Sequence, residues 1–296
     1  MLRLPVGVVN LLVEKTITKF FIIFFPFFLG FSCMGMKKIG PLRMELVFEQ
    51  QGIIPGGEFW IGWKIIRDKG WHTYWKHPGD VGVPPSIKWD LPPGFVTGEL
   101  LYSLPEKVKM ARIRANGNYG ETLFLTKAQA PKDLEVGALI SVKAKASWLA
   151  CSRQCKPGFA DLGTEVEVVQ EKVFDMALRS KFDEFRKLIP KPMGEDWIVS
   201  ASEHGRYIEL IFKSRSPSFE KDQGRPVFFC SNRLIRSDGN QFLTRDQGTF
   251  KLRMERSDWA KKDEELLTGL VYRKGGWGGG VETEYFSIQV PLLSPK

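Results

Sequence analysis

Apolar and polar residues alternate along most of the chain after residue 44, which is typical of half-buried β-strands. The clearest case is the segment ISVKAKASW, where every second residue from Ile140 to Trp148 is apolar and falls on one face. Similar short patterns occupy residues 45–50, 58–66, 164–170, 197–200, 207–212, 226–230, 249–254 and 285–290. Because Pro and Gly separate these segments, the pattern predicts antiparallel β-sandwiches.

One segment, residues 173–188, has a helical period instead. Its apolar residues recur at helical intervals from Phe174 to Phe185, and Pro190 follows as a stop signal. The sequence therefore predicts two β domains joined by a helix. We place the first domain at residues 44–170, a helical connector at 171–193 and a second, β-sandwich-like domain at 194–296.

The first 35 residues have a different character. Lys15 and Lys19 precede an apolar run, residues 20–31, that would span only about 18 Å as a helix, which is too short for a hydrocarbon core of about 30 Å. The run and the small residues after it predict a signal peptide, with an uncleaved anchor or lipidation of Cys33 as alternatives. We expect a periplasmic or otherwise exported protein, in a compartment where disulfides persist.

Composition narrows the classes of partner. The chain has 296 residues, of which 43% are hydrophobic and 26% charged, and a net charge of +9. Its basic residues are dispersed among acidic ones, which favours a solvated surface over a nucleic-acid-binding stripe. We therefore expect no nucleic-acid partner.

The most informative chemistry is a close pair of cysteines, Cys151 and Cys155, in the segment WLACSRQCKP. Three intervening residues on a turn can bring two Cα atoms within the disulfide range of about 4.4–6.8 Å, so we predict a bridge. Cys230 ends an apolar strand and is predicted to stay unpaired and buried. A zinc site would need two further ligands. His72 and His77 are conceivable, but nothing in their spacing supports one, so we assign no metal and no cofactor.

The bridge has two interpretations, a structural staple or a redox-active dithiol. A ring this small stabilises a fold by less than the roughly 3 kcal/mol of a 15-residue loop. Redox exchange requires an accessible thiolate, and Arg153 and Lys156 flank Cys155 and are predicted to stabilise one there. Cys151 follows apolar residues and is predicted to be the more buried, resolving sulfur. Chemistry alone leaves the two interpretations evenly matched.

Two blocks of sequence resemble a known family. The segment WLACSRQCKPGFADL resembles the Cys-x3-Cys segment of the N-terminal periplasmic domain of the thiol:disulfide interchange protein DsbD family, which includes the suppressor-of-copper-sensitivity branch. The block GWHTYWKHPGD, residues 70–80, is similar to a second segment of that domain. The resemblance covers about residues 44 to 170.

The resemblance implies an immunoglobulin-like sandwich in which Cys151 and Cys155 are the redox pair. It also implies a partner-dependent protein-disulfide reductase activity, with thioredoxin-like periplasmic proteins and a separate membrane thiol electron carrier as partners. The candidates for a partner surface or lid are Arg153 and Lys156 beside the pair and Tyr74 and Trp75 in the second block. For the two aromatic residues, ordinary sandwich core is the alternative.

The chain departs from the full family pattern in two respects. After residue 31 it contains no apolar run of membrane-spanning length, and it contains no Cys-x-x-Cys motif. We therefore expect a separate protein to supply electrons. Two rival functions stay open: a non-catalytic interaction module with a structural disulfide, and a copper-tolerance protein, which would need further soft ligands.

Overall fold

The computed structural model describes residues 35–110, 112–215, 224–246, 248–277 and 283–293. The predicted signal segment up to residue 34, with Cys33, lies outside these ranges. The chain from Ser32 to Lys296 clusters as one compact unit. No helix in the described ranges has the length and apolar character needed to cross a membrane.

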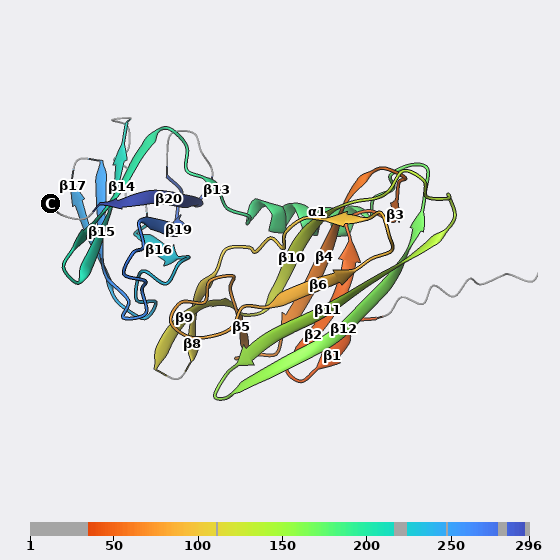
Figure 1. Ribbon diagram of the computed structural model, residues 1–296, viewed down its shortest axis with the longest axis horizontal. Coiled ribbons are helices and arrows are strands. Elements are labelled where there is room, and N and C mark those ends of the chain that lie inside the picture. The colour runs from red at the N-terminus through yellow and green to blue at the C-terminus, as the bar shows by residue number, and fades with distance from the viewer. Residues whose placement is uncertain (1–34, 111, 216–223, 247, 278–282, 294–296) are drawn as a thin grey trace, which may run out of the picture. The chain divides into compact units, whose positions relative to one another are not determined.

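Two β-sheets form the first domain (Figure 1). One sheet has the order β1 (Lys37–Ile39), β2 (Leu42–Phe48), β4 (Glu58–Arg67), β10 (Glu121–Gln129) and β7 (Val96–Thr97). The other has the order β3 (Gly52–Ile53), β12 (Cys155–Val168), β11 (Leu139–Cys151), β5 (His72–Tyr74), β9 (Ile113–Asn118) and β8 (Glu106–Met110), and β6 (Ser86–Asp90) also pairs with β11. All pairings in these sheets are antiparallel except that of β3 with β12.

The predicted alternation positions the core between these sheets. Along β11 the residues Ile140, Val142, Ala144, Ala146 and Trp148 are buried in one hydrophobic cluster with residues of β2, β4 and β12. The residues between them are exposed or half-buried, because successive side chains of a strand point to opposite faces. The prediction of an all-β sandwich is confirmed.

The second domain is built from one continuous set of paired strands. Its order is β16 (Pro226–Cys230), β19 (Leu266–Arg273), β20 (Tyr285–Leu293), β14 (Trp197–His204), β15 (Tyr207–Ser214), β18 (Thr249–Glu255) and β17 (Gln241–Asp246), with β13 (Lys191–Pro192) paired to β20. β20 pairs with β19 along most of its length and with β14 only at Leu292 and Leu293. Strands on both sides of β20 contribute to one core around the buried Trp277.

The predicted helix is present as α1 (Met176–Lys187), slightly shorter than residues 173–188. The Asp175 carboxylate caps its N-terminus by accepting from the backbone N–H groups of Ala177 and Leu178. Phe182 is fully buried against Leu123 and Leu125 of β10. The segment expected to be a connector therefore packs on the first domain.

A polar contact links the two β domains. The Asp80 carboxylate accepts from the backbone N–H of Ser237 at 2.7 Å and from the hydroxyl of Ser257 at 2.7 Å. Ser237 and Ser257 are buried, so their donors have little access to water. Hydrogen bonds to a charged acceptor are worth more than neutral ones, and a buried donor left unpaired is costly.

We expect Asp80→Ala to lower the free energy of unfolding by about 2 kcal/mol, because it leaves two buried donors unpaired. The measurement is urea denaturation followed by tryptophan fluorescence. Asp90→Ala, which removes an exposed carboxylate from β6, is the matched control. Equal midpoints for the two variants would contradict the prediction.

Candidate functional site

A disulfide closes the end of the long hairpin formed by β11 and β12. Cys151 is the last residue of β11 and faces Cys155, the first residue of β12. Their Cα atoms are 4.1 Å apart and their sulfur atoms are bonded. The backbone N–H of Ser152 donates to the carbonyl of Gln154 at 3.0 Å within the turn. The predicted bridge is therefore present, at the end of a strand and not at a helix N-terminus.

The two sulfur atoms have different environments. Cys151 is 0% exposed, whereas Cys155 is exposed at the turn. The difference arises because Cys151 packs in a small cluster with Tyr74, Val108 and Ala115. Cys151 is therefore the more buried residue of the pair, as the apolar residues before it predicted, and the attacking role of Cys155 stays a prediction.

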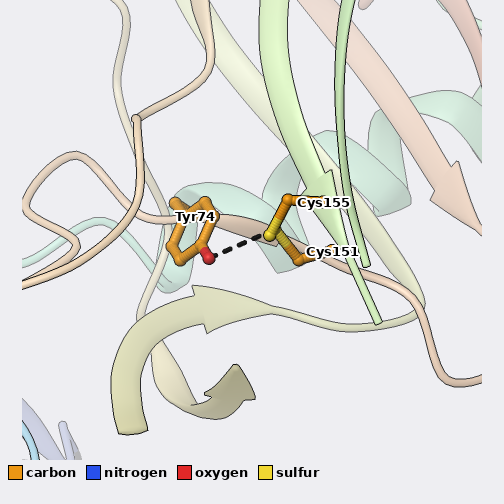
Figure 2. Close-up of a disulfide and its surroundings, with 3 residues drawn as sticks. All are labelled: Tyr74, Cys151 and Cys155. Carbon is orange, nitrogen blue, oxygen red and sulfur yellow. Dashed lines mark hydrogen bonds between the residues drawn. A yellow bond between two sulfur atoms is a disulfide. The ribbon is translucent and has the colours of Figure 1, made fainter. Parts of the chain in front are cut away.

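Tyr74 contacts the buried sulfur directly. Its hydroxyl donates a hydrogen bond to Cys151 Sγ at 3.3 Å (Figure 2). Burial raises the pKa of Tyr74 above its usual value, so the hydroxyl stays protonated and remains a donor at neutral pH. A donor in this position stabilises negative charge on Cys151 whenever the disulfide opens.

Gly82 holds the ring of Tyr74 in place. Its φ is +104°, a backbone conformation that residues other than glycine rarely adopt. A Cβ added at this position would lie 2.3 Å from carbon atoms of the Tyr74 ring. Glycine at this position lets the loop pack on the face of Tyr74. The loop therefore helps to direct the hydroxyl toward Cys151.

Tyr74 and Trp75 do not form an exposed surface. Tyr74 is 0% exposed and Trp75 is 5% exposed, so both are core residues in this structure. Trp75 packs with Phe229 and Leu270 of the second domain. Their burial favours the alternative of ordinary core over an exposed partner surface: Tyr74 contacts Cys151, and Trp75 packs against Phe229 and Leu270.

The basic residues beside the hairpin are at the surface. Arg153 and Lys156 are exposed on either side of Cys155 in the sequence. The Lys156 ammonium lies 5.4 Å from the centre of the Trp71 ring, a cation–π contact that holds it near the hairpin. The predicted effect of these charges on the Cys155 thiolate stays a prediction.

A buried histidine stands beside the cysteine pair and a buried arginine is bonded to the neighbouring residue of β5, and sequence reasoning did not assign them these places. His72 is 0% exposed and stands opposite Cys151 in the pairing of β5 with β11. Arg67 is also buried and donates to the Thr73 hydroxyl, at 2.9 Å from Nε, and to the Thr122 hydroxyl. Burial lowers the pKa of Arg67 to about 9. In the sequence, the one indication that His72 lies at the site was its position within the GWHTYW block.

Cys230 is the third cysteine within the described part of the chain. Cys230 is free and buried, and its thiol donates to the side-chain oxygen of Asn232 at 3.1 Å. Burial raises its pKa, which keeps it protonated and unreactive. The prediction of an unpaired, buried Cys230 is confirmed. Within the described ranges, no three His, Cys, Asp or Glu side chains gather closely enough to hold a metal ion.

A family model matches the part of the chain that carries the cysteine pair. Residues 43–165 match the family model described as thiol:disulfide interchange protein DsbD, N-terminal, which confirms the resemblance over that segment. Within it lie both cysteines, Tyr74 and His72. No curated protein sequence matches the chain.

A solved structure with the same fold is the N-terminal periplasmic domain of ScsB from Proteus mirabilis. It has a TM-score of 0.61 and 16% sequence identity, and the match covers 87% of this chain and 96% of that one. At that coverage the similarity extends over both β domains, and at that identity it concerns the fold alone. A protein of unknown function from Porphyromonas gingivalis W83 has a TM-score of only 0.24, with 11% identity over 86% of this chain and 100% of that one.

Proposed function

From the family match of residues 43–165 and the hairpin disulfide within it, we propose that the first domain is a thiol–disulfide exchange module. The observation that carries the proposal is the asymmetry of the pair, with Cys155 an exposed residue at the turn and Cys151 buried against a hydroxyl donor. Exchange proceeds through a mixed disulfide, which needs one reachable sulfur and a second one close behind it.

The exchange step follows from this geometry. A thiolate of the partner attacks the exposed sulfur of Cys155, the bond between the two cysteines breaks, and Cys151 leaves as a thiolate. The Tyr74 hydroxyl, already bonded to Cys151 Sγ, stabilises that charge. The second thiol of the partner then attacks its own sulfur in the mixed disulfide and releases Cys155. The partner is oxidised by two electrons and the module is reduced by two.

The reverse reaction uses the same groups. Cys155 attacks the disulfide of a partner, and Cys151 then attacks Cys155 Sγ and releases the partner as a dithiol. Arg153 and Lys156 favour the reaction by placing positive charge beside the thiolate of Cys155. The module therefore acts as a carrier between two partners of different reduction potential.

The partners follow from the family and from the chemistry. We expect thioredoxin-like proteins on one side, because their dithiols are exposed and can reach a hairpin tip. A separate membrane thiol carrier is expected on the other. These exchanges take place in an exported location, where the family acts and disulfides persist.

The reduction potential of the Cys151–Cys155 pair tests the proposal. We expect a value less negative than about −300 mV, because structural disulfides generally lie below that value. The protein is equilibrated in dithiothreitol or glutathione buffers and alkylated, and the peptide that contains both cysteines is analysed by mass, so that Cys230 does not contribute. A potential well below −300 mV would identify a structural disulfide and support the interaction module instead.

A further inference from the structure

His72 is a buried polar side chain that forms no hydrogen bond with any residue the structure describes. It is 0% exposed, and among those residues neither Nδ1 nor Nε2 has a partner within hydrogen-bond distance. Its ring meets the rings of Tyr74 and Tyr119 edge to face, each at 5.4 Å between centres. Most buried polar groups are hydrogen-bonded, and an orphaned one costs free energy. The burial of an imidazole without hydrogen-bond partners is therefore unusual and needs a physical reason.

The strand register places this imidazole beside the buried sulfur. His72 is directly opposite Cys151 in the antiparallel pairing of β5 with β11. Residues directly opposite each other have side chains on the same face, with Cβ atoms about 4.5–5.5 Å apart. Tyr74, two residues along β5, lies on that same face and bonds to Cys151 Sγ. The neighbouring pair Thr73 and Ala150 lies on the other face.

The hydrogen-bonding capacity of Cys151 depends on its redox state. In the disulfide its sulfur carries no hydrogen and is only a weak acceptor. In the reduced form it carries an S–H group, which is a donor. Burial, with a contribution from Arg67, lowers the pKa of His72 to about 4, so the imidazole is neutral at physiological pH and offers one acceptor nitrogen.

We propose that His72 is a positioning residue that shifts the redox equilibrium of the pair toward the dithiol. On reduction the S–H of Cys151 donates to the acceptor nitrogen of His72, which has no partner while the disulfide is closed. The unpaired nitrogen destabilises the oxidised form, and the new bond stabilises the reduced form. This inference rests on the proposed exchange function and assigns a role within it.

The electron and proton balance does not involve a net change at His72. A partner dithiol gives two electrons and two protons, its two sulfurs become a disulfide, and Cys151 and Cys155 become thiols. The imidazole remains neutral before and after. Its effect is on the relative free energies of the two states and not on the stoichiometry.

The test compares reduction potentials of the wild type and His72→Phe. Phenylalanine keeps an aromatic ring of similar shape between Tyr74 and Tyr119 but has no ring nitrogen. We expect the disulfide of the variant to be about tenfold harder to reduce at equilibrium, which corresponds to about 30 mV toward more negative potential. His72→Val, which is smaller and suits a strand, tests the same prediction without crowding the site.

His77→Phe is the matched control. His77 lies in the same loop region and contacts the Trp75 ring at 5.6 Å, but it does not face Cys151 in the strand pairing. We expect this variant to keep the wild-type potential. The unfolding free energies of oxidised and reduced forms of each variant complete the comparison. If His72 is purely structural, its replacement changes the unfolding free energies of the oxidised and reduced forms by the same amount. If His72 shifts the redox equilibrium, its replacement changes the difference between these two free energies.

An unchanged potential in both His72 variants would overturn the inference, as would an equal shift in His77→Phe. These outcomes are separable from a failure of the proposed function. The shift is a difference between variants and is measurable whether the wild-type potential lies above or below that of structural disulfides. The exchange function is tested by the absolute reduction potential of the wild type and by trapping a mixed disulfide with a partner.

Discussion

A Cys151→Ser variant is expected to accumulate a mixed disulfide through Cys155, whereas Cys155→Ser should accumulate little. Cys155 is exposed at the hairpin turn, so its thiolate can reach a partner, and without Cys151 nothing releases the partner again. Cys151 is 0% exposed and is covered by Tyr74 and its neighbours, so it cannot reach a partner even when it is the only thiol of the pair.

The probe is a thioredoxin in which the second cysteine of the active site is serine and the first is activated as a mixed disulfide with thionitrobenzoate. Attack by Cys155 releases the coloured thionitrobenzoate anion and leaves a covalent complex that is visible by non-reducing electrophoresis. We expect Cys151→Ser to react on the order of tenfold faster or more than Cys155→Ser, since thiolate access controls the rate.

The double variant, with both cysteines replaced by serine, measures the background from Cys230 and any other thiol. Similar rates for the two single variants would remove the assignment of attacking and resolving sulfurs. If neither variant exceeded the double variant, the structural disulfide would be the better account of this pair.

The second large effect concerns acid stability. His72 has a pKa of about 4 in the folded protein, against about 6.5 in an unfolded chain, mainly because burial disfavours the imidazolium and secondarily because Arg67 repels it. Between these two pH values the unfolded state binds the additional proton. Stability therefore rises with pH across this window and is lost as pH falls from about 6.5 to 4.

The magnitude follows from the difference in pKa. At 1.36 kcal/mol for each unit, His72 accounts for a loss of about 3 kcal/mol of unfolding free energy on acidification across the window. The rings of Tyr74 and Tyr119 meet the His72 ring edge to face and supply no negative charge at this pH, and the nearby Arg67 is positively charged.

We expect the His72→Phe variant to lose less unfolding free energy than the wild type when the pH is lowered, because it lacks the contribution of His72. The measurement is urea denaturation at pH 7 and at pH 4.5, with the wild type and the variant compared at each pH. Other groups titrate in the same range, so the decisive quantity is the difference between the two proteins. His77→Phe is expected to remove a similar part of the loss, because burial, with a contribution from Lys76, lowers the pKa of His77 to about 4 as well. An equal loss of stability on acidification in wild type and His72→Phe would contradict the prediction.

The sequence determined the features that depend on short-range order. The alternation along β11 and the helical period of α1 are both local, and each agrees with the structure. The Cys151–Cys155 bridge is also local, because three residues of turn bring the two cysteines together in any fold that keeps the hairpin. The same holds for their unequal burial, which follows from the apolar residues on one side of the pair.

Only the tertiary structure decided what surrounds that pair. The bond from Tyr74 to Cys151 spans 77 positions of sequence, and the contact of Asp80 with Ser237 spans 157. The sequence marks Tyr74 as part of the GWHTYWKHPGD block but does not show which strand lies beside it. Strand register decides this, and a slip of one residue would turn His72 and Tyr74 to the opposite face, away from Cys151. The cysteines come from the local sequence, whereas the histidine and the hydroxyl beside them come from the pairing of β5 with β11.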